Sequence, residues 1–222
     1  MPRSRNPITF DANCTACPRL ARFLAQVRSE CPNYHARPVP AFGDARADLL
    51  VAGLAPGMHG ANRTGRPFTG DFAGILLYRT LHKYGFASHA GSDDPQDGLV
   101  LSRCRVTNVV KCLPPQNKPA IDEVRRCNHY LAAELAAVKP RAVLALGTVA
   151  HQAVLLACSL KAIAYPFAHH AVHALPGAPG AQGLMLFDSY HCSRYNTQTR
   201  RLTEAMFDAV MHDIATFLSH PA

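Results

Sequence analysis

Short apolar runs alternate with segments of helical periodicity along this chain. Three runs have the length and composition of buried strands: residues 48–54, 103–110 and 142–146. Four segments carry apolar side chains at helical spacing: residues 75–84, 120–138, 148–158 and 203–218. Two further strands are predicted on either side of the turn-rich stretch LPGAPGAQ, over residues 167–173 and 183–188.

Strands that alternate with helices are typical of an α/β fold built on a mostly parallel sheet. No linker or repeat divides the sequence, so we expect a single domain over residues 1–222. In such folds, ligands bind beyond the carboxyl ends of the strands. Three loops leave those ends, with the sequences GLAPGMHGANRTGRPFTGD, TNVVKCLPPQNKP and DSYHCSRYNTQT.

The charge composition suggests a class of partner. Hydrophobic residues make up 48% of the chain, which excludes a disordered protein. Charged residues make up only 17%, yet 23 Lys and Arg outnumber 15 Asp and Glu and give a net charge of +8. A basic excess at low charge density favours a polyanionic partner, with an ordinary basic protein as the alternative.

Two observations bear on location. The stretch MPRSRNPITFDANC contains no apolar run, so we expect no secretory signal. Residues 142–160 carry no Lys, Arg, Asp or Glu and approach membrane-spanning length. Gly147, Thr148, His151 and Gln152 interrupt this run, which favours a buried strand followed by a helix. We therefore expect a cytoplasmic protein with no membrane segment.

Eight cysteines are too sparse for a secreted disulfide scaffold. Cys14 and Cys17 form a C-x-x-C pair, and Cys112 and Cys127 bracket the proline-rich loop. Four thiolates from two such pairs can hold zinc or a cubane iron–sulfur cluster, and spacing alone does not choose between them. Free structural thiols are the alternative. The remaining cysteines could compete as ligands: Cys31, Cys104, Cys158 and Cys192.

A second candidate metal tract contains His169, His170 and His173. On a strand, His169 and His173 would share a face while His170 would point the opposite way. No cysteine or acid lies nearby in the sequence to complete a site, so the tract alone does not favour zinc.

Three motifs, taken together and in this order, resemble the signature of the uracil-DNA glycosylase superfamily, in its type 5 branch. They are GLAPGMHGANRTGRPFTGDFAG, TNVVKCLPPQNKP and YHCSRYNTQTRRLT, and with the cysteine pattern the resemblance covers nearly the whole chain. It implies a three-layer α/β/α sandwich, for which we expect a central, mostly parallel four-stranded sheet. It also implies a [4Fe–4S] cluster with Cys14, Cys17, Cys112 and Cys127 as ligands.

The same resemblance assigns candidate catalytic residues. Leu54 stands where the similar type 4 branch carries a Glu, so the usual water-activating acid is missing from this position. By resemblance, Asp71 replaces that acid, while its ordinary alternative is an N-cap for the helix that follows. Asn117 would help to position water, or is only a loop Asn beside proline. His191 would donate a hydrogen bond to the uracil O2 as negative charge develops there.

Base binding would use four further residues. By resemblance, Phe68 stacks on a base flipped out of the duplex; its alternative is a small core under the loop. Ala55 and Gly57 would offer backbone N–H groups, and the Asn108 carboxamide can pair with the O4 and N3 edge of uracil. Asn108 could equally be a strand-end turn residue.

Two basic loops without acids suggest a DNA-binding face. The candidate contacts are Ser193, Arg194, Asn196, Arg200 and Arg201 after the last predicted strand, and Lys111 in the second loop. Tyr195 and Cys192 depart from the family pattern, where Gln and Pro or Val are more usual.

These observations predict a monofunctional DNA glycosylase that removes uracil, and other deaminated bases, from double-stranded DNA as a monomer. Leu54 leaves a less polar pocket, which fits broader base tolerance. Two alternatives stay open: a uracil-DNA binder without turnover, and a zinc-stabilised nucleic-acid-binding module.

Overall fold

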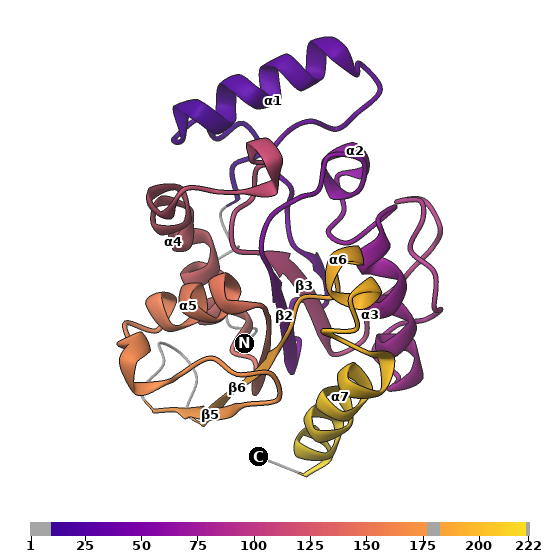
Figure 1. The fold of residues 1–222 in the computed structure, drawn as a ribbon, viewed down its shortest axis with the longest axis vertical. Coiled ribbons are helices and arrows are strands. Elements are labelled where there is room, and N and C mark those ends of the chain that lie inside the picture. Colours follow the sequence, from indigo (N-terminus) through magenta and orange to yellow (C-terminus); the bar gives the residue numbers. More distant parts are fainter. Residues whose placement is uncertain (1–9, 177–182, 221–222) are drawn as a thin grey trace, which may run out of the picture.

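A computed structural model describes residues 10–176 and 183–220 (Figure 1). Its six strands form one sheet in the order β1-β3-β2-β4-β6-β5. The strands are β1 Phe42–Gly43, β2 Leu49–Gly53, β3 Cys104–Asn108, β4 Ala142–Leu146, β5 Val172–Leu175 and β6 Leu184–Ser189. The four central strands, β3, β2, β4 and β6, run parallel, and both edge strands run antiparallel to their neighbours.

The sheet therefore has six strands, and the expectation of four is wrong. Its four central parallel strands, β3, β2, β4 and β6, correspond to the predicted runs 103–110, 48–54, 142–146 and 183–188. β1 adds an edge of only two residues, too short to produce a periodic pattern. β5 begins at Val172 rather than at 167, because residues 168–171 form a turn in which Ala171 N–H donates to the Ala168 carbonyl oxygen. The last six residues of the stretch LPGAPGAQ, 177–182, lie outside the described residues.

Helices cover both faces of the sheet, which confirms the three-layer arrangement (Figure 1). On one face lie α1 Pro18–Glu30, α4 Ile121–Val138 and α5 Thr148–Ala157. On the other lie α3 Phe72–Lys83 and α7 Glu204–Ser219. The loops carry short helices: α2 Ala61–Thr64, α6 Arg194–Gln198, and the single 3-10 turns η1 Pro115–Asn117 and η2 Ala162–Ala164.

Strand alternation divides the apolar residues between two cores. In β2, Leu50 and Ala52 belong to the core under α4 and α5, whereas Leu49 and Val51 belong to the core under α3 and α7. All five residues of β2 are buried, because helices cover both of its faces. This explains why the central strands read as continuous apolar runs.

The uncharged stretch 142–160 consists of β4 and α5, as its sequence predicts. Within the described residues, no helix has the length and apolarity needed to cross a membrane. The expectation of no secretory signal rests largely on residues 1–9, which lie outside the described part.

Candidate active site

A cavity of about 570 Å³ opens at the carboxyl ends of the four parallel strands. Strand register brings these ends level, with Gly53 beside Asn108 and Leu146 beside Ser189. The cavity brings together every residue predicted for catalysis or base binding: Ala55, Gly57, Phe68, Asp71, Asn108, Asn117 and His191. Its size lies within the range of small-molecule pockets.

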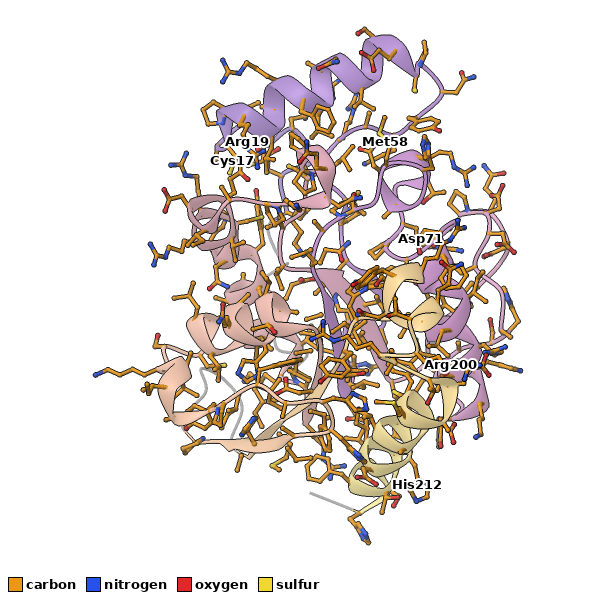
Figure 2. All side chains as sticks on the ribbon, in the orientation of Figure 1. Cys17, Arg19, Met58, Asp71, Arg200 and His212 are labelled. Atoms are coloured by element: carbon orange, nitrogen blue, oxygen red, sulfur yellow. The ribbon has the colours of Figure 1, made fainter. Side chains whose placement is uncertain are left out.

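Asp71 is both the N-cap of α3 and part of the cavity wall (Figure 2). Its Oδ1 accepts a hydrogen bond of 2.9 Å from Gly74 N–H. A Cβ atom at Gly60 would lie 2.5 Å from Asp71 Oδ2, so glycine is needed where this loop passes the carboxylate. Burial raises the pKa of Asp71, partly opposed by backbone hydrogen bonds from Gly74 and Ala73. The two expected roles, cap and pocket acid, therefore coexist.

Phe68 forms a buried, strained part of the site. Its φ of 53° lies in the left-handed region, which a bulky residue adopts only when its surroundings hold it there. Tyr78 Oη–H donates to the preceding carbonyl oxygen, that of Pro67, at 2.8 Å. A Cβ atom at Gly53 would lie 2.4 Å from the Phe68 ring, so this glycine makes room for the aromatic side chain.

His191 stacks on Phe68, with ring centroids 5.9 Å apart and planes inclined by 26°. Burial lowers the pKa of His191 to about 4, so the imidazole is neutral at physiological pH. A neutral imidazole still carries one N–H donor.

Two asparagines complete the polar lining. Asn108 is the last residue of β3, is buried, and contributes its side chain to the cavity. Among the described residues, no hydrogen bond holds its carboxamide, which leaves its donors and acceptor free for a ligand. Asn117 lies in η1 on the opposite loop, exposed and with a φ of 56°.

The start of α6 borders the cavity. Ser193 caps this helix by accepting from Asn196 N–H, and both Ser193 and Arg194 line the pocket. The Asn196 side chain turns inward, where Nδ2–H donates to the His191 carbonyl oxygen at 2.8 Å. Asn196 therefore ties the loop that carries His191 to α6.

Arg194, Arg200 and Arg201 are exposed, and no described carboxylate forms an ion pair with any of them. Arg194 lies over the Phe72 ring and Arg201 over the Tyr190 ring, so aromatic side chains orient both guanidinium groups. Figure 2 labels Arg200, which follows α6. Tyr195, in α6, is 71% exposed.

Lys111 is wrongly predicted as a phosphate contact. Its side chain is 2% exposed, and Nζ donates to Glu134 Oε2 at 3.0 Å and to Thr107 Oγ1. Arg105 also pairs with Glu134. A lysine in an acid-free loop resembles a surface cation, and the sequence gives no sign that its partner lies 23 residues away in α4.

The four predicted cluster cysteines come together. Cys14, Cys17, Cys112 and Cys127 line one small cavity where the start of α1 meets α4. Cys127 Sγ accepts a hydrogen bond of 3.3 Å from Lys111 N–H. Burial raises the pKa of Cys112 to about 12 and that of Cys127 to about 11, so their thiolates need a bound cation. Arg19, labelled beside Cys17 in Figure 2, binds Glu123 of α4 at 2.6 Å.

Some contributors were not predicted. Gly147, Thr148 and Val149, at the start of α5, also line the pocket. Gly147 has a φ of 95°, and a glycine directly after an apolar strand is the signal that could have revealed this fourth loop. Arg66, buried against Asp97 at 2.6 Å, fixes the first loop to the polar stretch HAGSDDPQDG.

Fold and site together define an α/β protein with an open, mostly apolar pocket at the carboxyl ends of its strands, lined by a few polar side chains and by the exposed Arg194. Comparison with known protein families identifies the family to which this chain belongs. Residues 40–215 match the model of the uracil DNA glycosylase superfamily, and the chain belongs to this family.

Individual relatives support the type 5 branch. The chain is 46% identical to a type-5 uracil-DNA glycosylase of Thermus thermophilus, covering 89% of this chain and 90% of the relative. It is 42% identical to a type-5 uracil-DNA glycosylase of Pyrobaculum aerophilum, over 86% and 83%. A third, from Mycobacterium leprae, is 41% identical over 90% and 89%. The resemblance carried by the three sequence motifs is confirmed.

Proposed function

We propose that this protein is a monofunctional DNA glycosylase that hydrolyses the N-glycosidic bond of uracil, and of other deaminated bases, in DNA. The observation that carries this proposal is the single pocket in which Asp71, His191, Asn108 and Phe68 meet, in a chain of the uracil DNA glycosylase superfamily. The described strands form one sheet, which supports a single domain over residues 1–222.

Base recognition follows from the pocket lining. A flipped base enters between the loops and packs against Phe68, whose ring is already held by His191 and Gly53. The free carboxamide of Asn108 donates to O4 and accepts from N3–H of uracil. Ala55 and Gly57 line the same cavity and offer backbone N–H groups to the base.

Hydrolysis requires a water molecule at C1′ and a stabilised leaving base. The Asp71 carboxylate, with Asn117 across the pocket, orients the water and accepts its proton. The electrons of the breaking C1′–N1 bond pass to uracil, whose O2 gains negative charge. The neutral His191 imidazole donates a hydrogen bond to that oxygen. No lysine lines the described pocket, so water is the nucleophile, and the products are free base and an abasic site.

The four cysteines that line one small cavity support the implied [4Fe–4S] cluster. Cys14, Cys17, Cys112 and Cys127 supply four thiolates, and the Lys111 N–H provides a hydrogen bond to one of the sulfurs. When bound, the cluster supplies a covalent link between the start of α1, the Asn117 loop and α4. We infer a structural role, in which the cluster fixes the position of Asn117.

The proposed partner is double-stranded DNA. The exposed Arg194 lines the pocket at the start of α6, and the exposed Arg200 and Arg201 follow the end of that helix. These three side chains can neutralise phosphates while Tyr195 enters the duplex. A monomer suffices because every proposed catalytic group comes from one chain. A cytoplasmic location stays a prediction.

The decisive experiment incubates the protein with duplex oligonucleotides carrying uracil, hypoxanthine or xanthine and scores abasic sites. Turnover on uracil is expected. Uracil-specific binding without release of base would instead support the damage-sensor alternative. Iron together with absorbance near 400 nm would distinguish the cluster from zinc and so exclude the zinc-stabilised module.

A further inference from the structure

A second cluster of metal-ligating side chains lies outside the base pocket, between α5 and the edge of the sheet. His151 comes from α5, His173 from β5 and Asp188 from β6. Their ligand atoms all lie within 4.8 Å of one another. Asp188 is 0% exposed and His151 is 1% exposed. The cluster contains none of the cysteines.

One metal ion could bind all three donor atoms if His151 and Asp188 moved apart slightly from their present hydrogen-bond distance. His151 Nδ1 lies 2.8 Å from Asp188 Oδ2, and His173 Nε2 lies 3.4 Å from the same oxygen. Ligands about 2.0–2.1 Å from a tetrahedral Zn²⁺ stand roughly 3.4 Å apart. The two imidazole rings are inclined by 64° with centroids 5.7 Å apart, so they converge rather than stack.

The hydrogen-bond partners of His151 fix where its lone pair points. Nε2–H donates to the Tyr165 carbonyl oxygen at 2.8 Å, and a carbonyl oxygen can only accept. In the neutral ring, Nδ1 then carries the lone pair, and it faces the Asp188 carboxylate at 2.8 Å. A lone pair and a carboxylate repel each other unless a positive charge lies between them. Metal-binding histidines commonly donate their other N–H to a backbone carbonyl in this way.

A proton on His151 Nδ1 is the competing source of positive charge. Burial lowers the pKa of His151, but the Asp188 carboxylate outweighs this and the pKa is raised. A proton there satisfies His151 and is shared by the Asp188 carboxylate, because Oδ1 and Oδ2 both lie 2.8 Å from Nδ1. It leaves His173 Nε2, which in the described structure is buried without a hydrogen-bond partner. One metal ion would satisfy all three side chains, whereas one proton would not.

The two other histidines of the sequence tract have different partners. His169 Nδ1 accepts from Tyr190 N–H at 3.2 Å, and His170 Nε2 lies 2.8 Å from Asp213. Only His173 joins the cluster. Its acid and its second histidine come from positions distant in the sequence, which is why the tract alone did not predict a site.

We propose that His151, His173 and Asp188 bind one Zn²⁺ ion. Two imidazoles and a carboxylate are a donor set that Zn²⁺ prefers, with a fourth position left for water. The ion links three elements behind the wall of the base pocket. Asp188 lies three residues before His191, and His151 N–H donates to Gly147 of the pocket lining at 3.1 Å. It therefore anchors β6, the strand that precedes the His191 loop.

The test measures bound zinc in the full chain, prepared without a histidine tag and equilibrated with a small excess of Zn²⁺. His173→Gln and Asp188→Asn are expected to bind one zinc fewer than the wild type. The matched control is His212→Gln, which removes an exposed histidine of α7 and should bind as the wild type does (Figure 2). At free Zn²⁺ about 100 times Kd, Tm should rise by roughly 5–10 °C in wild type and control only.

Equal zinc content and equal Tm shifts in wild type and His173→Gln would overturn the proposal and leave a protonated His151 as the buried charge. Zinc taken up by the four cysteines would appear in every variant, so it cancels in the comparison. His173 lies on an edge strand with its side chain 15% exposed, which keeps the test independent of whether Asp188→Asn folds.

Discussion

At the scale of single residues, Asp71 caps α3 and is proposed to act on water, and two substitutions can separate these roles. Asn caps helices about as well as Asp, whereas Ala does not. Asp71→Asn should therefore keep the cap on α3 and lose the carboxylate that acts on water. We expect a single-turnover rate on uracil lower by ~10²-fold or more, the usual scale for a general base, at a Tm equal to or above that of the wild type. Asp71→Ala should lose the same rate and, in addition, ~1 kcal/mol of stability.

The pH dependence of stability checks the same residue. Burial raises the pKa of Asp71, so the folded protein favours the protonated acid. Ionisation of Asp71 then costs stability as pH rises through that raised pKa. The Tm advantage of Asp71→Asn should be present above the raised pKa and vanish in acid, where both side chains are neutral. Normal turnover by Asp71→Asn would remove Asp71 from the mechanism and leave Asn117 as the residue that positions water.

His191 should act as a neutral donor. Because burial lowers its pKa to about 4, the rate should show no inflection from this residue near the ordinary histidine value of about 6.5. Any fall in rate toward acid pH that reflects the raised pKa of Asp71 should persist in His191→Gln and disappear in Asp71→Asn. His191→Gln should also slow uracil release, with a smaller loss on bases that leave more readily. An inflection near the ordinary value that vanishes in His191→Gln would contradict a neutral imidazole.

At the scale of elements, α6 holds His191, the proposed hydrogen-bond donor to the leaving base, through Asn196. The bond from Asn196 Nδ2–H to the His191 carbonyl oxygen fixes the loop between β6 and α6. Asn196→Ala should reduce the uracil rate by roughly tenfold, less than the ~10²-fold that a 1 Å misplacement can cost. DNA affinity and its salt dependence should stay unchanged. The control is Gln198→Ala, an exposed position on the same helix. Weaker DNA binding at an unchanged rate would show that Asn196 contacts DNA.

The cysteine site joins elements that are distant in the sequence. Cys17 directly precedes α1, Cys112 lies in the loop between β3 and η1, and Cys127 lies in α4. Cys17→Ala should lose iron and lower Tm by more than about 5 °C, because loss of a bound metal is among the largest single-residue effects. Cys31→Ala, at the far end of α1, is the matched control and should keep the iron content and the Tm of the wild type. Iron content near zero in well-folded wild type would contradict the cluster.

Elements with long, regular patterns could be predicted from the sequence, and elements fixed by tertiary contacts could not. β4 was placed at its observed bounds, because a strand covered on both faces is apolar throughout. β1 and the shifted start of β5 depend on edge pairing, which leaves little trace in composition. α1 was missed, although Leu20, Leu24 and Val27 on its buried face have helical spacing.

The same division applies to the site. Motif residues of the pocket converge as predicted, because each follows a parallel strand and those ends meet. Lys111 was assigned to DNA on charge and loop position, and its buried partner Glu134 overrules that assignment. Asn196 was assigned to DNA in the same way, and its side chain binds the His191 carbonyl oxygen. Which side of a loop a polar residue faces is decided by packing from other elements, and no local pattern contains that information.

At the scale of the whole molecule, the net charge of +8 should attract DNA most strongly where cationic side chains have no carboxylate partner. Arg194, Arg200 and Arg201 have no carboxylate partner among the described residues, and all three cluster around α6. DNA affinity should therefore fall steeply with salt. Each arginine that neutralises a phosphate contributes ~0.9 to the slope of log affinity against log salt, because binding releases counterions from the duplex.

The double variant Arg200→Ala/Arg201→Ala should accordingly lower that slope by ~1.8 and weaken binding to uracil-containing and undamaged duplexes alike. Tm should stay near the wild-type value, because both side chains are exposed. Lys161→Ala, an exposed cation in the segment after α5, is the matched control for charge and should leave the slope unchanged. Lys111→Met offers the opposite pattern: an unchanged slope with lost stability, because it breaks a buried ion pair with Glu134. Titrations by fluorescence anisotropy at several salt concentrations measure the slopes. An unchanged slope in the double variant would mean that these arginines only solvate the surface and that the phosphates are bound elsewhere.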